Sequence, residues 1–380
     1  MDKTFHYYAT YAAAILAGYP HNDALAVAYS AGFVDECSKT LLGKLEAPVI
    51  AATTQLQMEL MDAKTDVMGL QDITRIWSSF HFLPRDLYAP KMKHCGERYM
   101  RKYRLICGPN GTLVKDTIDN ARDKSLQAIG VSMHVVADTW AHMYFAGTPS
   151  VVINNTDDYF FEIMPDGTEN QIRFKHSLSP DDVEKGVYMS SIYQFDENSI
   201  MNLGHGRAGH LPDYGFCVYK YLPAWGGYKE IIKDNPSDYN HAFRQMIYAL
   251  RCIRDDAEFK TDIYDEEAIK GYEDEINAII TKRHPTCADD WKALGEKLSG
   301  QTVPEFDINT HQQEYMDASD KDNTFLGKFF EAAISQKSMV TNRIYESGSM
   351  LAGYSVTPKR NMVTKKMLDE MANDVSKGGK

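Results

Sequence analysis

Apolar residues recur at intervals of three and four along most of the chain, and few long runs of β-branched residues interrupt them. This spacing places apolar side chains on one face of a helix, so it predicts amphipathic helices. We expect helices over residues 4–37, 53–64, 124–144 and 240–259. The predicted fold class is therefore all-α, a bundle of many helices.

One segment departs from the helical pattern. Between residues 151 and 177, the sequence "YFFEIMPDGTENQIRFKH" contains two short alternating stretches around an Asp-Gly turn, which predicts a small inserted β-hairpin that could serve as a lid. Beyond Trp225 the chain is more charged and still helical in pattern. We expect a helical core over 1–225 that contains the hairpin, and a C-terminal helical extension over 226–380 that is either separate or packed on the core as one domain.

Composition and charge limit the classes of function. The 380 residues are 43% hydrophobic and 25% charged, as in ordinary globular proteins with a large core. The formal net charge of −12 argues against a partner that is a long nucleic acid, because such proteins usually present a basic surface. A small anionic substrate held by bound metal is compatible with this charge, because the ion sets the local field.

The apolar runs and the cysteines indicate where in the cell the protein is located. No run of about 18 apolar residues occurs, so no transmembrane segment is expected. The apolar opening of the chain lacks the small-residue cleavage pattern of a signal peptide. The six cysteines are scattered without a Cys-x-x-Cys pair, which favours reduced core thiols. We therefore expect a cytoplasmic protein.

Candidate chemistry is concentrated in "MHVVADTWAHMYFAG", where His134, Asp138 and His142 follow one another at intervals of four. Residues four apart on a helix drift only about 40° around the axis, so the three side chains form one stripe. The two histidines are separated by roughly 12 Å of helical rise, and the central carboxylate can serve an ion on either side. The stripe predicts a polynuclear metal site. The alternatives are a buried hydrogen-bond network between helices and an exposed polar stripe.

Further potential ligands occur in other apolar surroundings. They are His6 in "FHYYATY", His81 in "SSFHFLPRD", His205 and His210 in "NLGHGRAGHLPDYG", and Asp35 at the end of an apolar helical run. Taken singly, each suits an ordinary role as a core residue, a helix cap or a turn residue. His205 and His210 are five apart, about 140° around a helix, so they favour a loop or a helix start.

The order of these residues resembles that of the zinc-dependent phospholipase C and single-strand nuclease superfamily. The resemblance implies an all-helical fold, three zinc ions in a cleft between helices, and hydrolysis of phosphate esters. It covers residues 6 to about 213. Carried over residue by residue, it assigns Asp35, His81, His134 and Asp138 to one zinc, His142 and His205 to a second, and His6 and Asp138 to a third.

This chain departs from the superfamily pattern at three places. One is the gap between the helical Asp and the next His, which is five residues in the familiar members and three here, between Asp138 and His142. In the superfamily the amino-terminal residue is itself a zinc ligand, whereas this sequence has no matching Trp, so we expect the ion at His6 to be held most weakly. The superfamily has a carboxylate four residues after the later His, whereas Gly209 stands there in this chain, so His210 or Asp213 is expected to complete the second site. The segments "HYYATYAAAILAGY" and "GHGRAGHLPD" are also similar to an uncharacterised bacterial family of cytosolic proteins.

Other hydrolase architectures are excluded by their signatures. The sequence contains no His-Asp dipeptide, no Glu-x-x-His, no P-loop and no Gly-x-Ser-x-Gly elbow. HD-type phosphohydrolases, ferritin-like di-iron proteins, His-Glu-x-x-His proteases, P-loop nucleotide hydrolases and serine hydrolases of that type are therefore not expected.

The combined prediction is a metal-dependent hydrolase, a phosphoesterase that uses a metal-activated water. Its cofactor would be two or three zinc ions or other divalent metals, and its substrate a small phosphate ester or another small anion. Asp35 is the candidate catalytic residue, which would orient the water as a ligand or as a general base. Arg207 is the candidate phosphate clamp, with a solvated or structural arginine as the alternative. Two alternatives are a non-catalytic protein with structural metal sites and a helical binding protein without metal.

Overall fold

Helices dominate the described chain, which comprises residues 1–56, 58–59, 67–91, 93, 95–148, 150–156, 159–175, 180–189 and 204–349 of the computed structural model. The α-helices are α1 (Thr10–Leu16), α2 (His21–Phe33), α3 (Lys39–Lys44), α5 (Val67–Phe80), α6 (Glu97–Tyr103), α7 (Thr112–Ala121), α8 (Leu126–Ala141), α9 (Val151–Asn154), α10 (His205–Ala208), α11 (Asn235–Arg254), α12 (Glu273–Thr281), α13 (Ala288–Ser299), α14 (Gln312–Asp317) and α15 (Phe325–Glu346). A π-helix, η1 (Phe5–Ala9), precedes α1, and short 3₁₀ turns include η2 (Val49–Ala51) and η5 (Leu211–Asp213).

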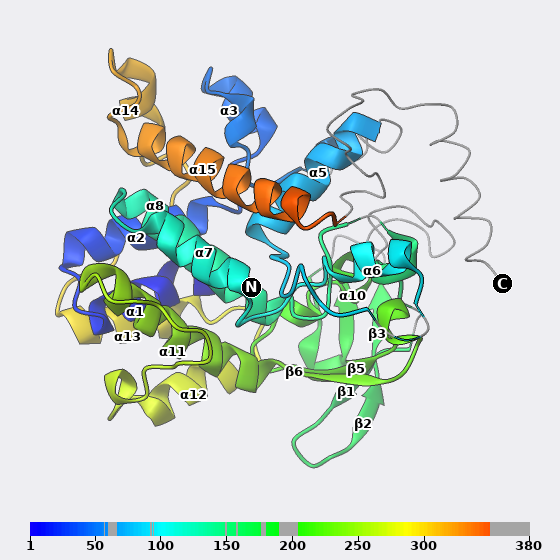
Figure 1. Cartoon of the computed structure of the whole chain (residues 1–380). Helices are drawn as coiled ribbons and strands as arrows, with labels where there is room; N and C mark the ends of the chain where they lie inside the picture. The colour runs from blue at the N-terminus through cyan, green and yellow to red at the C-terminus, as the bar shows by residue number, and fades with distance from the viewer. Residues whose placement is uncertain are drawn as a thin grey trace.

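Two small sheets make the all-α prediction wrong. A four-stranded antiparallel sheet has the order β2-β1-β5-β6, and a two-stranded parallel sheet pairs β3 with β4. The strands are β1 (Phe161–Ile163), β2 (Glu169–Gln171), β3 (Arg173–Lys175), β4 (Val187–Met189), β5 (Val218–Tyr221) and β6 (Ile231–Asp234). The fold is therefore mixed, with most helices at the left and the strands at the lower right of Figure 1.

The predicted hairpin is present as β1 and β2, but it is only half of its sheet. Ile163 pairs with Glu169 across the Asp-Gly turn, and Phe161 also pairs with Lys220 of β5. Strands β5 and β6 have four residues each, which is too short to establish an alternating pattern against helical neighbours. Their pairing with β1 joins distant parts of the sequence, so no local turn signal announces it. Residues 176–177 of the predicted hairpin segment lie outside the described residues.

The predicted helical stretches have different outcomes. The 4–37 stretch contains η1, α1 and α2, the 124–144 stretch contains α8, and α11 covers most of the 240–259 stretch. In the stretch 53–64, residues 53–56 are not helical, and most of the rest lies outside the described residues, as does the C-terminal end that includes "DVSKGGK".

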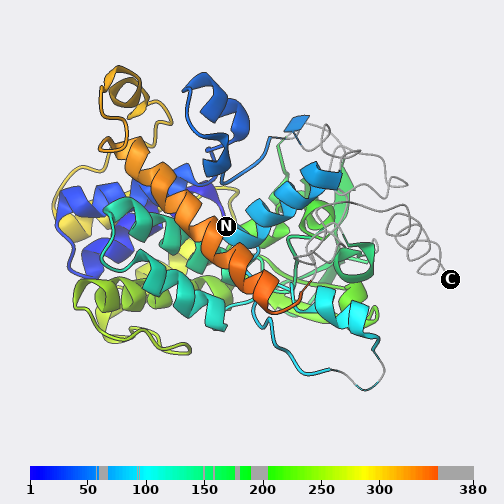
Figure 2. The same ribbon diagram turned by 45° about the horizontal axis from the view of Figure 1, so that its top comes forward.

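Helix α8 is the central element of the helical core. Every side chain from Gln127 to Ala141 is buried, because α2, α7, α11 and α15 all pack against this helix. Figure 2 shows α15 crossing the helical part of the molecule, and the amino terminus near the middle of the view. Met1 is correspondingly only 6% exposed. Groups on α8 and at the amino terminus are therefore largely shielded from solvent.

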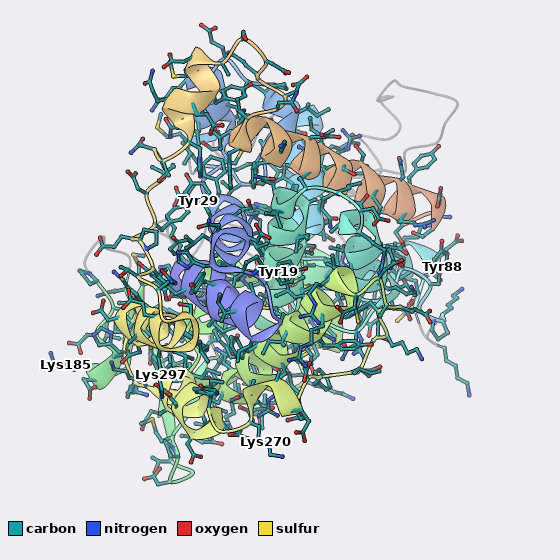
Figure 3. The ribbon with its side chains drawn as sticks, turned by 90° about the vertical axis from the view of Figure 1, so that its left-hand side faces the viewer. Tyr19, Tyr29, Tyr88, Lys185, Lys270 and Lys297 are labelled. Carbon is teal, nitrogen blue, oxygen red and sulfur yellow. The ribbon has the colours of Figure 1, made fainter. Side chains whose placement is uncertain are left out.

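The C-terminal part of the chain packs against the first helices. The hydroxyl of Tyr19 donates to the carbonyl of Leu250 at 3.1 Å, and that of Tyr29 donates to the carbonyl of Asp307 at 3.0 Å. Figure 3 shows Tyr19 and Tyr29 among the packed helices, whereas Lys297 lies toward the periphery. One hydrophobic cluster contains buried residues from both parts, so the residues beyond Trp225 contribute to the same core as the amino-terminal helices.

Two further features bear on the sequence predictions. None of the helices in the described part of the chain combines the length and the apolar character that a bilayer crossing requires. All six cysteines are free, and Cys37, Cys107, Cys217 and Cys252 are buried.

Gly130 allows α2 and α8 to approach closely. A Cβ atom at this position would lie 2.3 Å from the carbonyl oxygen of Val27 and 2.5 Å from the Cβ of Ser30. The close approach matters beyond packing, because it brings the carbonyl of Ala31 within 2.9 Å of Nδ1 of His134.

We expect Gly130→Ala to lower the free energy of unfolding by about 1–3 kcal/mol, because the added methyl group forces the two backbones apart. Urea denaturation monitored by circular dichroism measures this change. Gly43→Ala in α3 is the matched control, because a Cβ there meets nothing within 4 Å. That control should leave stability unchanged or raise it by up to about 1 kcal/mol. Equal losses in the two variants would contradict the packing argument.

Candidate metal centre

Helix α8 carries two of the candidate ligands and ends next to a third. The helix begins after Ser125, whose hydroxyl accepts a hydrogen bond from the backbone N–H of Ala128 at 3.3 Å. His134 and Asp138 lie one turn apart on α8, and His142 is its C-cap residue. The exposed fractions of these three residues are 0%, 1% and 5%. The stripe is therefore buried, which excludes the interpretation as an exposed polar face.

Asp138 lies between two sets of nitrogen atoms. Its Oδ1 is 3.1 Å from Nε2 of His6 and 2.5 Å from the α-amino nitrogen of Met1. Its Oδ2 is 3.1 Å from Nδ1 of His81 and 3.2 Å from Nε2 of His134. Burial would raise the pKa of this carboxyl, but His142, the α-amino group and His134 hold it well below its usual range. Asp138 is therefore an anion, and each of its two oxygens lies near nitrogen atoms that could bind the same metal ion.

The first metal-capable group consists of Asp35, His81 and His134. Asp35 follows the end of α2, and His81 follows the end of α5. Oδ1 of Asp35 lies 3.9 Å from Nδ1 of His81 and 3.9 Å from Nε2 of His134. Two ligand atoms about 2.0–2.1 Å from a tetrahedral zinc are roughly 3.3 Å apart, so this group is slightly wider than a closed shell.

The second group consists of His142, His205 and Asp213. Oδ1 of Asp213 lies 3.4 Å from Nε2 of His142 and 3.5 Å from Nε2 of His205, close to the roughly 3.3 Å expected for two ligands of one tetrahedral ion. Nε2 of His205 is buried and makes no hydrogen bond to any residue that the structure describes. His205 begins the short helix α10, and Asp213 ends the 3₁₀ turn η5. An ion would satisfy the imidazole nitrogen that lacks a partner.

The third group consists of His6, His134 and Asp138. His6 lies in the π-helix η1 and stacks on His134 with ring centroids 3.8 Å apart. Among the described residues, neither ring nitrogen of the fully buried His6 has a well-aligned hydrogen-bond partner, although Nε2 lies 3.1 Å from Oδ1 of Asp138. A buried imidazole without well-aligned hydrogen bonds is costly, so this setting favours a bound cation.

Three histidines are oriented by backbone carbonyls. Nδ1 of His134 is 2.9 Å from the carbonyl oxygen of Ala31, and Nδ1 of His142 is 2.7 Å from that of His81. Nε2 of His81 is 3.0 Å from the carbonyl oxygen of Thr53. Donation to a carbonyl fixes which ring nitrogen carries the proton, and the other nitrogen is left for a metal. The ring nitrogens left without a proton are those that face Asp35, Asp138 or Asp213.

His134 has only one nitrogen available, which limits the ways in which ions can be shared. Because Nδ1 faces the carbonyl of Ala31, Nε2 can serve either the group with Asp35 or the group with His6. If Nε2 binds an ion in the group with Asp35, the other group retains only His6 and Asp138 as side-chain ligands. The α-amino nitrogen of Met1 lies next to this pair, 2.5 Å from Oδ1 of Asp138 and 3.4 Å from Nε2 of His142, and it would have to lose a proton before it could bind a metal.

Charge favours cations at this centre. Asp35, Asp138 and Asp213 all have a pKa below the usual range, because neighbouring histidines and, for the last two, the α-amino group outweigh the effect of burial. Burial lowers the pKa of His6 and of His142 to about 4, so both are neutral at pH 7. Against burial, Asp138 raises the pKa of the α-amino group of Met1 to about 10. Burial would lower the pKa of His81 as well, but the hydrogen bond to Asp138 raises it above its usual value. Three carboxylates thus face one ammonium and two neutral imidazoles beside His81, and carboxylates together with imidazoles suit divalent metals such as zinc.

The two remaining predicted residues lie at the edge of the centre. His210 is exposed, with Nδ1 3.6 Å from Oδ2 of Asp213, and it belongs to none of the metal-capable groups among the described residues. Of the two alternatives for the second site, the structure therefore brings Asp213 into the group. Arg207 is half-buried in α10, two residues after His205.

Two contributors were not predicted from the sequence. One is the α-amino group of Met1, and the other is the carbonyl of Thr53 that accepts from His81. Both act through backbone atoms, which any residue type supplies. The resemblance did indicate the amino terminus, because the amino-terminal residue is a ligand in that superfamily, but the missing Trp argued against the same role here. Only the buried setting of Met1, at 6% exposure, distinguishes it from an ordinary chain end.

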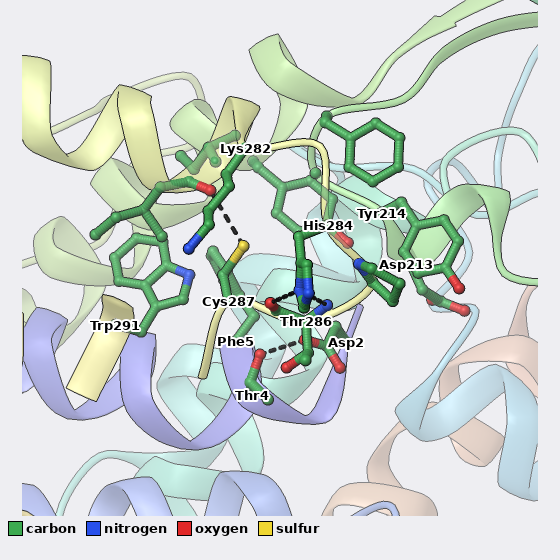
Figure 4. A pocket seen from close by; sticks show the side chains of 16 residues that line it. Asp2, Thr4, Phe5, Asp213, Tyr214, Lys282, His284, Thr286, Cys287 and Trp291 are labelled. Atoms are coloured by element: carbon green, nitrogen blue, oxygen red, sulfur yellow. Dashed lines mark hydrogen bonds between the residues drawn. The ribbon is translucent and has the colours of Figure 1, made fainter. Parts of the chain in front are cut away.

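A pocket borders the centre on the side of Asp213. It is lined by Asp2 and Phe5 near the amino terminus, by Trp291 of α13, and by residues 282 and 284–287, which lie between α12 and α13. Figure 4 shows Trp291 on one side of this pocket and Asp213 on the opposite side. The C-terminal part of the chain therefore forms a wall next to a candidate ligand.

Comparison with known proteins gives one match. A model described as "Family of unknown function (DUF6765)" matches residues 1–344, which include all three metal-capable groups. No curated protein and no solved structure gives a significant match. The chain therefore belongs to the family of unknown function DUF6765.

Proposed function

We propose that this protein is a metal-dependent hydrolase that acts on small phosphate esters and uses two or three divalent ions, most simply zinc. The observation that carries the proposal is the position of Asp138, a 1% exposed carboxylate with imidazole nitrogens near both oxygens. A carboxylate in this position can hold two cations a few ångströms apart, the arrangement used for in-line displacement at phosphorus. The resemblance to zinc-dependent phospholipase C and single-strand nucleases supports the same chemistry.

Each group would have a defined part in the reaction. Bound divalent ions would lower the pKa of water toward about 7 and neutralise charge on the phosphoryl oxygens. Asp35 is anionic and 20% exposed at its side chain, so it can accept a hydrogen bond from water and orient it toward phosphorus. Arg207 could donate two hydrogen bonds to phosphoryl oxygens in the planar geometry of a guanidinium.

The pocket next to Asp213 has room for only about one or two water molecules, with a volume of about 30 Å³, so it would receive only a small group at the end of the ester. Its lining includes Phe5 and Trp291. The net charge of −12 disfavours a long polyanionic substrate, whereas a single phosphoryl group would be held by the cations.

The central experiment is elemental analysis of the purified protein, followed by a screen of phosphomonoesters, phosphodiesters and phospholipids before and after removal of metal by a chelator. We expect bound zinc or another divalent metal, and hydrolysis of one ester class that is lost with the chelator and restored by metal. Bound metal with no hydrolysis of any class would favour the alternative of structural sites. Absence of metal together with absence of hydrolysis would favour a helical binding protein.

If Asp138 binds two metal ions at once, a single substitution at this position should reduce the metal content by more than one equivalent. Asp138→Asn should lose more than one equivalent of metal, because the amide keeps the size of the side chain but removes the charge that holds two cations close together. Metal content measured after gel filtration provides the result.

The matched control is Asp119→Asn, on the exposed surface of α7, where the carboxylate pairs with Lys115 and Arg122. This control should retain the full metal content. Retention of all metal by Asp138→Asn would identify the buried stripe as a hydrogen-bond network that joins helices.

A second prediction concerns the pocket. Thr286 is an exposed lining residue, so Thr286→Phe should obstruct the entrance with little effect on stability. We expect KM for the preferred ester to rise by about fivefold or more, equivalent to about 1 kcal/mol of lost binding, while metal content stays the same. Steady-state kinetics measures the effect. Thr281→Phe, at the exposed end of α12 and outside the lining, is the control; equal changes in KM in both variants would argue against binding in this pocket.

A further inference from the structure

The C-terminal helix α15 carries two buried polar side chains beside the metal centre. The helix packs against α5, α8 and the turn η2, and Figure 2 shows it crossing this part of the molecule. Gln336 and Lys337 are 2% and 7% exposed. Each donates a hydrogen bond to a backbone carbonyl close to a candidate ligand, and these contacts give the helix a connection to the site that apolar packing alone would not provide.

Lys337 contacts the segment that holds His81. Its Nζ donates to the carbonyl oxygen of Ala52 at 3.0 Å, and the carbonyl of the next residue, Thr53, lies 3.0 Å from Nε2 of His81. Burial lowers the pKa of Lys337 to about 8, because desolvation penalises the ammonium. A methionine would fill similar space without that penalty, so the position of the amine calls for a role beyond packing.

Thr53 joins this segment to the end of α2. Its hydroxyl donates to the carbonyl of Val34 at 2.6 Å, and its backbone N–H donates to the carbonyl of Cys37 at 2.9 Å. These two carbonyls flank Asp35 in the sequence. One buried threonine thereby connects the backbone that carries Asp35 with the ring of His81, two members of the same metal-capable group.

Gln336 holds the other side of His81. Its Nε2 donates to the carbonyl of Ser79 at 3.2 Å and to the hydroxyl of Thr117 at 3.0 Å. Ser79 lies at the C-terminal end of α5, two residues before His81. The neighbouring residues Gln336 and Lys337 thus fix the backbone before His81 and the carbonyl segment that orients its ring.

We propose that α15 is a positioning element of the metal centre, in which Lys337 holds the Ala52–Thr53 segment so that Nδ1 of His81 stays directed at the metal. This role rests on the proposed function, because it requires a cation in the group of Asp35, His81 and His134. Outer contacts of this kind typically change metal affinity by about 10–100-fold when they are lost.

The test is Lys337→Met, with Co²⁺ as the probe because Zn²⁺ is spectroscopically silent. In the full chain we expect the visible absorption of one Co²⁺ equivalent to change, and competition with a chelator to show about 10–100-fold weaker binding of that equivalent. Val340→Ala is the control, because Val340 is fully buried on the same helix. That control should lower the melting temperature, but its Co²⁺ spectrum and its Co²⁺ affinity should be the same as those of the wild-type protein.

Other variants keep the test decisive if Lys337→Met does not fold. Thr53→Val keeps the shape of the side chain and removes the hydroxyl donor, so it should weaken binding of the same Co²⁺ equivalent. Thr53→Ser keeps the hydroxyl, so it should bind that equivalent as the wild-type protein does. Wild-type Co²⁺ spectra and affinities in folded Lys337→Met, or wild-type binding in Thr53→Val, would overturn the positioning role. Failure of the wild-type protein to bind Co²⁺ at all would instead remove the metal centre itself, and the positioning role with it.

Discussion

The buried carboxylate of Asp138 is the constraint around which the structure is arranged. An ionised carboxylate without solvent is very unfavourable unless positive or hydrogen-bonding groups surround it. The chain supplies such groups from separate segments, with His6 and Met1 at one oxygen and His81 and His134 at the other. Helix α8 therefore has to be covered by the amino terminus on one side and by the end of α5 on another. The central place of α8 in the helical core follows from the same requirement.

Backbone carbonyls then decide how the imidazoles present themselves. Ala31, Thr53 and His81 each contribute a carbonyl to one ring nitrogen of a candidate ligand. These carbonyls lie at or just beyond the ends of α2, η2 and α5, where carbonyls lack partners within the helix. The helix ends therefore contribute to the site in two ways. They leave carbonyls available to the imidazoles, and they place His81 and Asp35 shortly after the end of a helix. The π-helix at His6 adds a local irregularity of the type often found at functional sites.

Much of the candidate site could be predicted from the sequence, because metal ligands are restricted to a few residue types. The stripe on α8 is visible from its four-residue spacing, and the family resemblance indicated Asp35, His81 and His205. The choice between His210 and Asp213 could not be made, because the sequence does not show which of these side chains the short connection after α10 and the turn η5 direct inward. The contributions of Met1, Thr53 and Lys337 depend on tertiary contacts between atoms that have no characteristic pattern.

The fold class was predicted incorrectly for a related reason. Helical periodicity is local and accumulates over many residues, whereas β5 and β6 have only four residues each and pair with neighbours that lie outside any single window. On β5 Tyr219, Lys220 and Tyr221 are all buried, so even the structure shows no alternation of burial there that would distinguish a strand from a helix. The β1–β2 hairpin was recognisable because its Asp-Gly turn is encoded in adjacent residues.

Assembly of the centre from distant segments couples metal binding to folding. The potential donors extend from the amino terminus to Asp213, and the contacts that orient them extend to Lys337. The DUF6765 match ends at residue 344, within α15, so the helix that holds the Thr53 segment belongs to the family unit together with the ligands. Without cations, three anionic carboxylates would share a buried cluster in which at least two imidazoles, those of His6 and His142, are neutral. Divalent ions would remove that imbalance only in the folded chain, so their binding free energy would add directly to its stability. The C-terminal helices therefore contribute to the same cooperative unit as the ligands, although none of the metal-capable side chains among the described residues lies on them.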